Sequence, residues 1–161
     1  MRELLPHAEA VAEILKARKE TIAVAESSAG GLIAAALLAV PGASAYFVGG
    51  AVVYTRAALL GLMDIPEERL KGLRPTSEPY ALLKAQHVRT QLSTTWGLAE
   101  NGVAGPTGNR YHEAPGRTCI AVSGRVEHVR LVETGSRDRV ENMYAFATAA
   151  LEVLSAALQE K

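Results

Sequence analysis

Residues 21–36, TIAVAESSAGGLIAAA, constrain the fold more than any other stretch of the chain. The first five are apolar and partly β-branched, whereas residues 32–40 are small and aliphatic, with high helix propensity. A short segment of polar residues and glycine separates the two runs. The pattern predicts a strand, a tight turn and a helix, as in layered α/β domains.

The turn itself, residues 26–31 (ESSAGG), gathers hydroxyl groups and backbone amides where the helix begins. The first turn of a helix has unpaired N–H donors and the positive end of the macrodipole, so it suits anions. We therefore expect a site here. A structural interpretation stays open, with a serine as helix cap and glycines that permit a close helix–strand contact. Glu26 either orients Ser28 or a ligand hydroxyl, or bonds to nearby backbone.

Known nucleotide and hydrolase motifs are missing from this turn. It lacks the G-x-G-x-x-G fingerprint, the Walker A lysine and the G-x-S-x-G elbow. The turn therefore predicts none of the mechanisms that belong to those motifs.

Composition excludes several classes of protein. The 161 residues predict one domain, residues 1–161, and the 17 basic residues balance 17 acidic ones, so we expect neither nucleic acid nor a membrane as partner. Cys119 is the only cysteine, which rules out an internal disulfide and a cysteine-built zinc site, and we expect no metal and no cofactor. No apolar run approaches the roughly 20 residues of a membrane span, which favours a cytoplasmic protein.

Helical and strand-like patterns alternate along the first hundred residues. Residues 4–18 carry an apolar stripe at helical spacing, and residues 45–54 are β-branched and aromatic around Gly49-Gly50. Thr55 is expected to cap a short helix. The other expected elements are a turn at 65–68, a helix at 76–92, a buried strand at 94–100, a hairpin of 117–123 and 127–133, and a long helix after residue 134.

This order of elements predicts an α/β layered fold with a mixed sheet. Ligands of such sheets usually lie at the carboxyl ends of strands. Three segments meet that description, namely residues 26–31, 54–56 and 101–108. The last belongs to a loop, residues 101–110, that is crowded with glycine and lets backbone approach a ligand.

Several ordered motifs resemble the CinA C-terminal domain family. They are residues 25–31 (AESSAGG), residues 41–44 (PGAS), Gly49-Gly50 with Tyr54, residues 102–106 (GVAGP) and residues 135–137 (GSR). The likeness extends over nearly the whole chain. It implies a three-layer α/β/α domain with a mixed, mostly parallel sheet, and a homo-oligomer that we expect to be a dimer or trimer.

The resemblance also implies a chemistry. Characterised members are pyridine nucleotide deamidases, which hydrolyse the carboxamide of nicotinamide mononucleotide with a Ser/Lys dyad. The partner would be a small nucleotide or phosphorylated amide. The family's nucleophile falls on Ser27, its accessory hydroxyls on Ser44 and Tyr54, and its phosphate-side arginine on Arg137. The expected ligand-binding residues are Ser28, Gly30, Gly31, Arg56, Asn101, Gly102, Gly105 and Arg137, with amides of residues 28–31 on the oxyanion.

The chain departs from the family pattern at this pocket. Leu59 stands where the family has its catalytic lysine, and leucine cannot accept a proton. Residues 26–31 read ESSAGG instead of ESCTGG, and Asn101 stands where a threonine usually precedes G-I-A-G-P. All three departures concern the expected active site.

A substitute for the missing base is not obvious. Arg56 would share a helical face with Leu59, but its guanidinium stays protonated and suits phosphate or carboxylate. His112 titrates near neutrality, and both a place in the pocket and a solvated place in the loop remain open. We expect surface charges at Lys71, Lys84 and His87.

Two functions remain open. The first is an amidohydrolase whose deamidase activity is altered or lost because Leu59 replaces the lysine. Losing a general base typically removes a factor of about 10²–10⁴ in rate. The second is an inactive paralogue that binds a nucleotide or phosphorylated metabolite, or serves as an oligomeric scaffold. A Ser27 hydroxyl buried far from Tyr54 and any cavity would exclude the predicted pocket.

Overall fold

A computed structural model describes residues 1–160, and Lys161 at the end of the predicted C-terminal segment lies outside the described residues. The elements are α1 (Leu5–Arg18), β1 (Ile22–Glu26), α2 (Leu32–Ala39), the 3-10 turn η1 (Ala43–Ala45), β2 (Phe47–Val52), α3 (Arg56–Met63), α4 (Glu67–Leu70), α5 (Glu78–Gln91), β3 (Trp96–Val103), β4 (Arg117–Ser123), β5 (Glu127–Glu133) and α6 (Arg139–Gln159).

The five strands form one sheet in the order β2-β1-β3-β4-β5. β1 pairs in parallel with both β2 and β3, whereas β3–β4 and β4–β5 are antiparallel. β4 alone runs against the other strands, so the sheet is mixed and mostly parallel, as predicted. Helical connections lead from β1 to β2 and from β2 to β3, whereas a tight turn joins β4 to β5.

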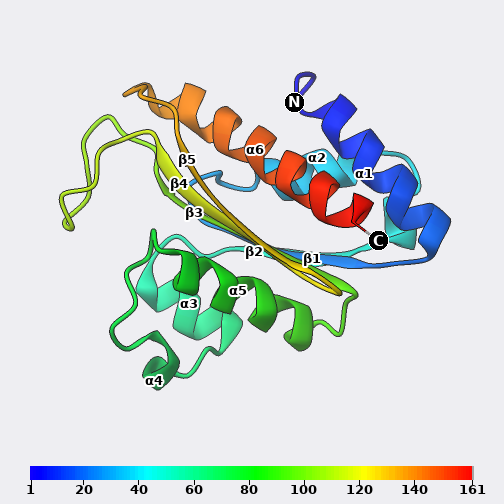
Figure 1. Ribbon diagram of the computed structural model, residues 1–161, viewed down its shortest axis with the longest axis horizontal. Coiled ribbons are helices and arrows are strands. Elements are labelled where there is room, and N and C mark those ends of the chain that lie inside the picture. The colour runs from blue at the N-terminus through cyan, green and yellow to red at the C-terminus, as the bar shows by residue number, and fades with distance from the viewer. Residues whose placement is uncertain (161) are drawn as a thin grey trace.

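Helices cover both faces of the sheet, which confirms the predicted three layers. Figure 1 shows α1, α2 and α6 on one face and α3, α4 and α5 on the other. β1 serves both layers because strand residues point alternately to opposite faces. Ile22 and Val24 belong to the core under α1, α2 and α6, and Ala23 and Ala25 to the core under α3–α5.

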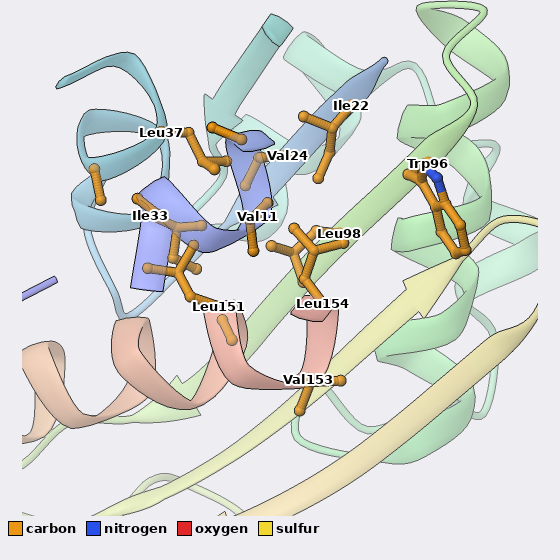
Figure 2. Close-up of a cluster of buried hydrophobic side chains, with 14 of the residues drawn as sticks. Val11, Ile22, Val24, Ile33, Leu37, Trp96, Leu98, Leu151, Val153 and Leu154 are labelled. Atoms are coloured by element: carbon orange, nitrogen blue, oxygen red, sulfur yellow. The ribbon is translucent and has the colours of Figure 1, made fainter. Parts of the chain in front are cut away.

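The first core is built from long aliphatic side chains. Figure 2 shows residues of α1, α2 and α6 gathered over β1 and β3, among them Val11, Ile33, Leu37, Leu151 and Leu154. Trp96 lies at the start of β3, and its indole Nε1 donates to Glu20 at 2.7 Å. This layer holds α2 in place behind the carboxyl end of β1.

The second core has small strand residues, so its helices lie close to the sheet. A Cβ atom at Gly97 of β3 would stand 2.0 Å from the Ala85 carbonyl oxygen of α5, which only glycine avoids. Backbone therefore packs directly on backbone between β3 and α5. The close approach brings the middle of α5 against the start of β3.

Most predicted elements are confirmed. Thr55 caps α3 by accepting from the Ala58 amide at 3.1 Å. One boundary is wrong, because β3 continues through Val103, so Asn101 and Gly102 belong to a strand and not to a loop. Across residues 1–160, no helix has both the length and the apolar character that crossing a membrane requires.

Candidate functional site

A cleft of ≈ 360 Å³ opens at the carboxyl ends of β1, β2 and β3. Its lining residues are Ser27, Val53, Tyr54, Thr55, Arg56, Leu73, Pro75, Thr76, Tyr80, Asn101, Gly102, Asn109, Arg110 and Tyr111. We call this space the cleft. The three segments that the sequence places at strand ends each contribute to it, and it lies where ligands of mixed and parallel sheets bind.

Ser27 and Tyr54 share the wall of the cleft, so the exclusion stated for the predicted pocket does not apply. Ser27 is half-buried directly after β1, and no residue in 1–160 hydrogen-bonds its hydroxyl. Leu59 is 1% exposed in the core of α3–α5 and does not line the cleft. Leu59 therefore does not block the cleft, and a leucine supplies no base.

The start of α2 is occupied by a carboxylate of the chain itself. Glu26 accepts from the backbone amides of Gly31 at 3.0 Å, Ile33 at 3.1 Å and Ala34 at 2.7 Å. Burial raises the pKa of Glu26, and the hydrogen bonds to these amides partly counteract that rise. Of the two roles left open for Glu26, the structural bond to backbone is the one observed.

A second carboxylate fills the turn before α2. Glu100 is fully buried and accepts from the amides of Ser27 at 3.1 Å and Ala29 at 2.9 Å. It also accepts from the hydroxyl groups of Thr118, at 2.9 Å, and Ser28. Four donors thus converge on one carboxylate.

Three of the four backbone amides at residues 28–31 already have an acceptor within the chain, the Ala29 amide in Glu100. The Gly30 amide donates to the Ser27 carbonyl at 3.1 Å, and the Gly31 amide belongs to Glu26. Ser28, Gly30 and Gly31 are absent from the lining of the cleft. A carboxylate of the chain itself neutralises the partial positive charge at a helix N-terminus as well as a bound anion does. These three residues form the turn outside the lining of the cleft, and their contact with a ligand stays a prediction.

Ser44 also lies away from Ser27. It is exposed in η1, which precedes β2, whereas Ser27 follows β1. Because β1 and β2 are parallel, the start of one and the end of the other lie at opposite ends of the sheet. Within one chain, Ser44 therefore does not contact a ligand held by Ser27.

Lys84 of α5 contradicts its prediction as a surface charge. It is fully buried, and its Nζ donates to Asn101 Oδ1 at 2.6 Å and to the Glu100 carbonyl at 3.4 Å. Burial lowers the pKa of Lys84 to about 8, although the Glu100 and Glu26 carboxylates act in the opposite direction. Of the other two, Lys71 is exposed, and His87 is half-buried against the Met63 carbonyl.

A signal for this burial is present in the sequence. Ala81, Lys84, Ala85 and Val88 follow the i, i+3, i+4, i+7 spacing of one helical face, and all four are buried. The lysine therefore lies in the middle of the apolar stripe of α5. The helical spacing of α5 indicates the burial of Lys84 better than its residue type does.

Asn101 connects Lys84 to the cleft. It is 4% exposed, it lines the cleft, and its Oδ1 is held by Lys84. Its Nδ2 is buried and has no hydrogen-bond partner among residues 1–160. A buried donor without a partner costs about 1–3 kcal/mol, so it calls for a functional explanation.

The cationic groups of the cleft are Arg56 and Arg110. Arg56 pairs with Glu67 at 2.8 Å, whereas Arg110 is exposed and its guanidinium carbon lies 4.9 Å from the Tyr111 ring centroid. Arg137, the arginine expected at the phosphate, does not line the cleft, and its Nε donates to the Pro106 carbonyl at 3.3 Å.

The glycines at and after the end of β3 contribute less than expected. Gly102 lines the cleft, but Gly105 is buried, and a Cβ atom there would lie 2.8 Å from the Arg137 carbonyl oxygen. Gly105 thus serves packing. His112 is exposed and outside the lining of the cleft, so the solvated alternative applies to it.

Arg139 was missed by sequence reasoning. Its guanidinium donates to the Tyr54 hydroxyl at 3.0 Å and to the Gly105 carbonyl at 2.7 Å, which ties β2 to the loop after β3. It begins α6, 85 residues from Tyr54 in the chain. No local pattern indicates such a contact.

The chemistry of the cleft follows from its side chains. Two guanidinium groups and three tyrosine rings line it, and no lysine, histidine, aspartate or glutamate does. Residues 1–160 contain no group of three or more His, Cys, Asp or Glu side chains placed to hold a metal ion. Such a cleft suits an anionic, aromatic ligand, because guanidinium pairs with phosphate and rings stack on rings.

Comparison with known proteins agrees with the architecture. The CinA-like protein of Anaeromyxobacter sp. (strain K) is 38% identical over 153 residues, 94% of this chain and 37% of that protein. The CinA-like protein of Synechococcus sp. (strain CC9902) is 40% identical over 115 residues, 71% of this chain and 27% of that protein. The chain thus spans well under half the length of these curated relatives.

A solved structure extends the likeness to three dimensions. The competence/damage inducible protein CihA from Agrobacterium tumefaciens superposes with a TM-score of 0.88 at 28% identity, covering 98% of this chain and 96% of that one. The family profile described as the CinA C-terminal domain matches residues 5–158. The chain belongs to the CinA C-terminal domain family.

Proposed function

We propose that the cleft binds a phosphorylated aromatic small molecule, and that a pyridine nucleotide such as nicotinamide mononucleotide is the first ligand to test. One observation carries this proposal: arginine and tyrosine side chains line the cleft, without any acidic side chain that would repel a phosphate. Family membership supports the choice of nucleotide.

Each group has a distinct part in binding. Arg110 is exposed and has no carboxylate partner among residues 1–160, so its guanidinium is free to pair with a phosphate. Tyr54, between β2 and α3, and Tyr111, in the loop after β3, each offer an aromatic ring to the cleft. Tyr80 is half-buried, and burial raises its pKa, so it enters the cleft as a neutral phenol.

Calorimetric titration of the purified chain tests this function. Nicotinamide mononucleotide is expected to bind at least tenfold more tightly than nicotinamide riboside, because the riboside lacks the phosphate that the arginines pair with. Equal affinities would contradict the assigned role of the arginines. Flat titrations with both compounds would contradict the proposed binding function.

Hydrolysis of an amide by Ser27 is the second candidate. Its hydroxyl lies in the wall of the cleft without a hydrogen-bond partner among residues 1–160, as a nucleophile poised for a ligand would. Because no base contacts it, any rate is expected to fall about 10²–10⁴-fold below that of a complete dyad. Ammonia release from nicotinamide mononucleotide that disappears in Ser27→Ala supports this candidate, and release equal in both proteins contradicts it.

Restoring a lysine at position 59 sharpens that assay. Leu59 is buried in the same apolar core that receives Lys84, so two lysines there would be costly. Leu59→Lys is therefore assayed together with urea unfolding, which shows that the variant is folded, and Lys84 is kept. A gain of ammonia release that depends on Ser27 would support a hydrolase site intact except for its base, whereas no gain would leave binding alone as the function.

Self-association is a further part of the proposal. β2 is an edge strand, and Val48 and Val52 on it are 51% and 45% exposed, beside Leu38 of α2 at 55%. Exposed apolar side chains on an edge strand favour contact with another chain. Light scattering is expected to report a dimer or trimer. A monomer at every concentration would contradict it.

A further inference from the structure

We propose that Asn101 recognises a carbonyl oxygen of the ligand through Nδ2, and that Lys84 is the positioning residue that fixes the amide in this orientation. The inference deepens the proposed nucleotide-binding function and rests on it. It assigns the class of ligand group, a carboxamide or another neutral carbonyl acceptor, and the residue that selects it.

The orientation of the Asn101 amide follows from the chemistry of Lys84. A charged ammonium has three N–H donors and no acceptor. At 2.6 Å from the Asn101 side chain, it therefore requires the amide oxygen, not the nitrogen, to face it. The Glu100 carbonyl, at 3.4 Å, accepts a second Nζ donor and keeps the lysine in this place.

The consequence is a donor held without a partner. With Oδ1 turned to Lys84, Nδ2 faces away from it and finds no acceptor among residues 1–160. Asn101 is more than nine-tenths buried, yet it lines the cleft beside Ser27 and Gly102. Nδ2 itself is covered in the free protein. A ligand oxygen that displaces the covering atoms removes the cost of the unpaired donor, so the protein selects for an acceptor at this point.

The same arrangement discriminates against a ligand that lacks the acceptor. A site built to hydrogen-bond a group rejects the analogue without it, because the buried donor then stays unpaired. A free rotation of the amide would weaken this selection, since Oδ1 would face the ligand part of the time. Lys84 prevents that rotation, and in this way a fully buried lysine that does not line the cleft acts on the ligand.

Other ionisable groups near Lys84 do not take over this role. Glu100 of β3 and Glu26 of β1 are the charges that act on it, and their carboxylates already accept from the turn before α2 and from α2. Cys119 of β4 lies opposite Asn101 in the sheet, and burial raises its pKa to about 11, so it stays a neutral thiol. Lys84 is thus the group whose charge orients the amide.

The test compares two ligands that differ only in an acetyl group, whose carbonyl is an acceptor without a donor. Calorimetry at pH 7 uses the 3-acetylpyridine analogue of nicotinamide mononucleotide and the pyridinium ribonucleotide that lacks the acetyl group. Wild type is expected to prefer the acetyl ligand about tenfold, which is about 1.4 kcal/mol. Asn101→Asp keeps the partner of Lys84 but replaces the donor by an oxygen, so the preference should invert. An Asn101→Asp preference equal to that of wild type would overturn the proposal.

The positioning role of Lys84 has its own readout. Lys84→Met should reduce the preference to about twofold or less while the affinity for the ligand without the carbonyl stays unchanged, whereas the exposed control Lys71→Met keeps the full preference. In wild type the preference for the ligand with the carbonyl should also decline between pH 7 and 9, as Lys84 loses its proton. In Lys84→Met this preference should not change with pH. A merely structural lysine would alter both affinities alike and would give no such pH profile.

Outcomes for the inference and for the proposed function are distinguishable. If neither ligand binds wild type, the nucleotide-binding function and the inference both fail. If both bind and the preference is unchanged in Asn101→Asp and Lys84→Met, the inference fails and the binding function stands. Side-chain amide resonances of Asn101 that do not move with pH in the free protein would also overturn the role of Lys84.

Discussion

The carboxyl end of β1 adjoins two regions that the sequence predicts as ligand sites and that differ in structure. Residues 26–34 at the start of α2 have the glycines, serines and helix amides typical of an anion site, but Glu26 and Glu100 accept their hydrogen bonds. The cleft on the side of α3 and α5 is lined by guanidinium groups and tyrosine rings, and the buried, unpartnered amide nitrogen of Asn101 belongs to its wall.

The difference shows that the N-terminus of a helix can bind an external anion only when no carboxylate of the chain already accepts from its backbone amides. Partial positive charge at a helix terminus attracts whichever carboxylate is held nearest, and an internal carboxylate has no entropy of binding to overcome. A glycine-rich turn beside a strand end therefore says little about ligands until the acidic side chains around it are placed. Here the unpaired donors lie on the other face of the sheet.

Removing Glu100 is expected to have the largest effect. Glu100→Ala takes the acceptor from four donors, two of them the backbone amides before α2, and should lower the free energy of unfolding by about 3–5 kcal/mol. Urea unfolding measures it. The control Glu133→Ala, which loses an exposed ion pair with Arg117, should cost less than about 1 kcal/mol. Similar losses in both variants would mean that the α2 start is not held by its internal carboxylate.

The pH dependence of stability isolates Lys84. Its pKa is lowered to about 8 in the folded chain from 10.5, so between these values the unfolded state binds more protons and the stability of wild type rises with pH. The rise amounts to roughly 3 kcal/mol. It should appear as a growing difference between wild type and Lys84→Met in urea unfolding from pH 7.5 to 10.5. Parallel curves would contradict the lowered pKa of the buried Lys84.

Two arginines give the smallest but most selective effect. Arg110→Gln should weaken binding of nicotinamide mononucleotide about tenfold, or about 1.4 kcal/mol, because Arg110 lines the cleft. Arg137→Gln is the matched control, since Arg137 bonds to the Pro106 carbonyl outside the cleft and its loss should change affinity less than twofold. Calorimetry compares the two. A reversed order would return the phosphate to the arginine expected from the family.

Local sequence patterns predicted the helices and strands well, because the apolar spacing of helices, the β-branched runs of strands and the capping residues all depend on residues close together in the chain. The hairpin of β4 and β5 has the predicted bounds. What failed depends on contacts distant in sequence. Lys84 was taken for a surface charge because its burial arises where α5 packs on β3 around Gly97. Ser44 was grouped with Ser27 although parallel pairing of β1 and β2 separates them.

The candidate site was predicted in part for the same reason. Ser27, Tyr54, Arg56, Asn101 and Gly102 line one cleft because three strands end at the same edge of the sheet, and strand ends are visible in the sequence. The carboxylates that accept from the amides before and in α2 could not be predicted from the sequence. Glu100 follows an apolar run in β3, and only the fold brings its carboxylate to the turn before α2.

Chemical-shift mapping of the amide groups during titration with nicotinamide mononucleotide tests the central claim most directly. The ligand is expected to move the resonances of Tyr54, Arg56, Asn101 and Arg110, on the walls of the cleft. Amides at residues 31–34, which Glu26 occupies, should stay nearly unchanged. Largest shifts at residues 31–34 and none at Asn101 or Arg110 would contradict the account, since the ligand would then bind where the chain has placed its own carboxylate.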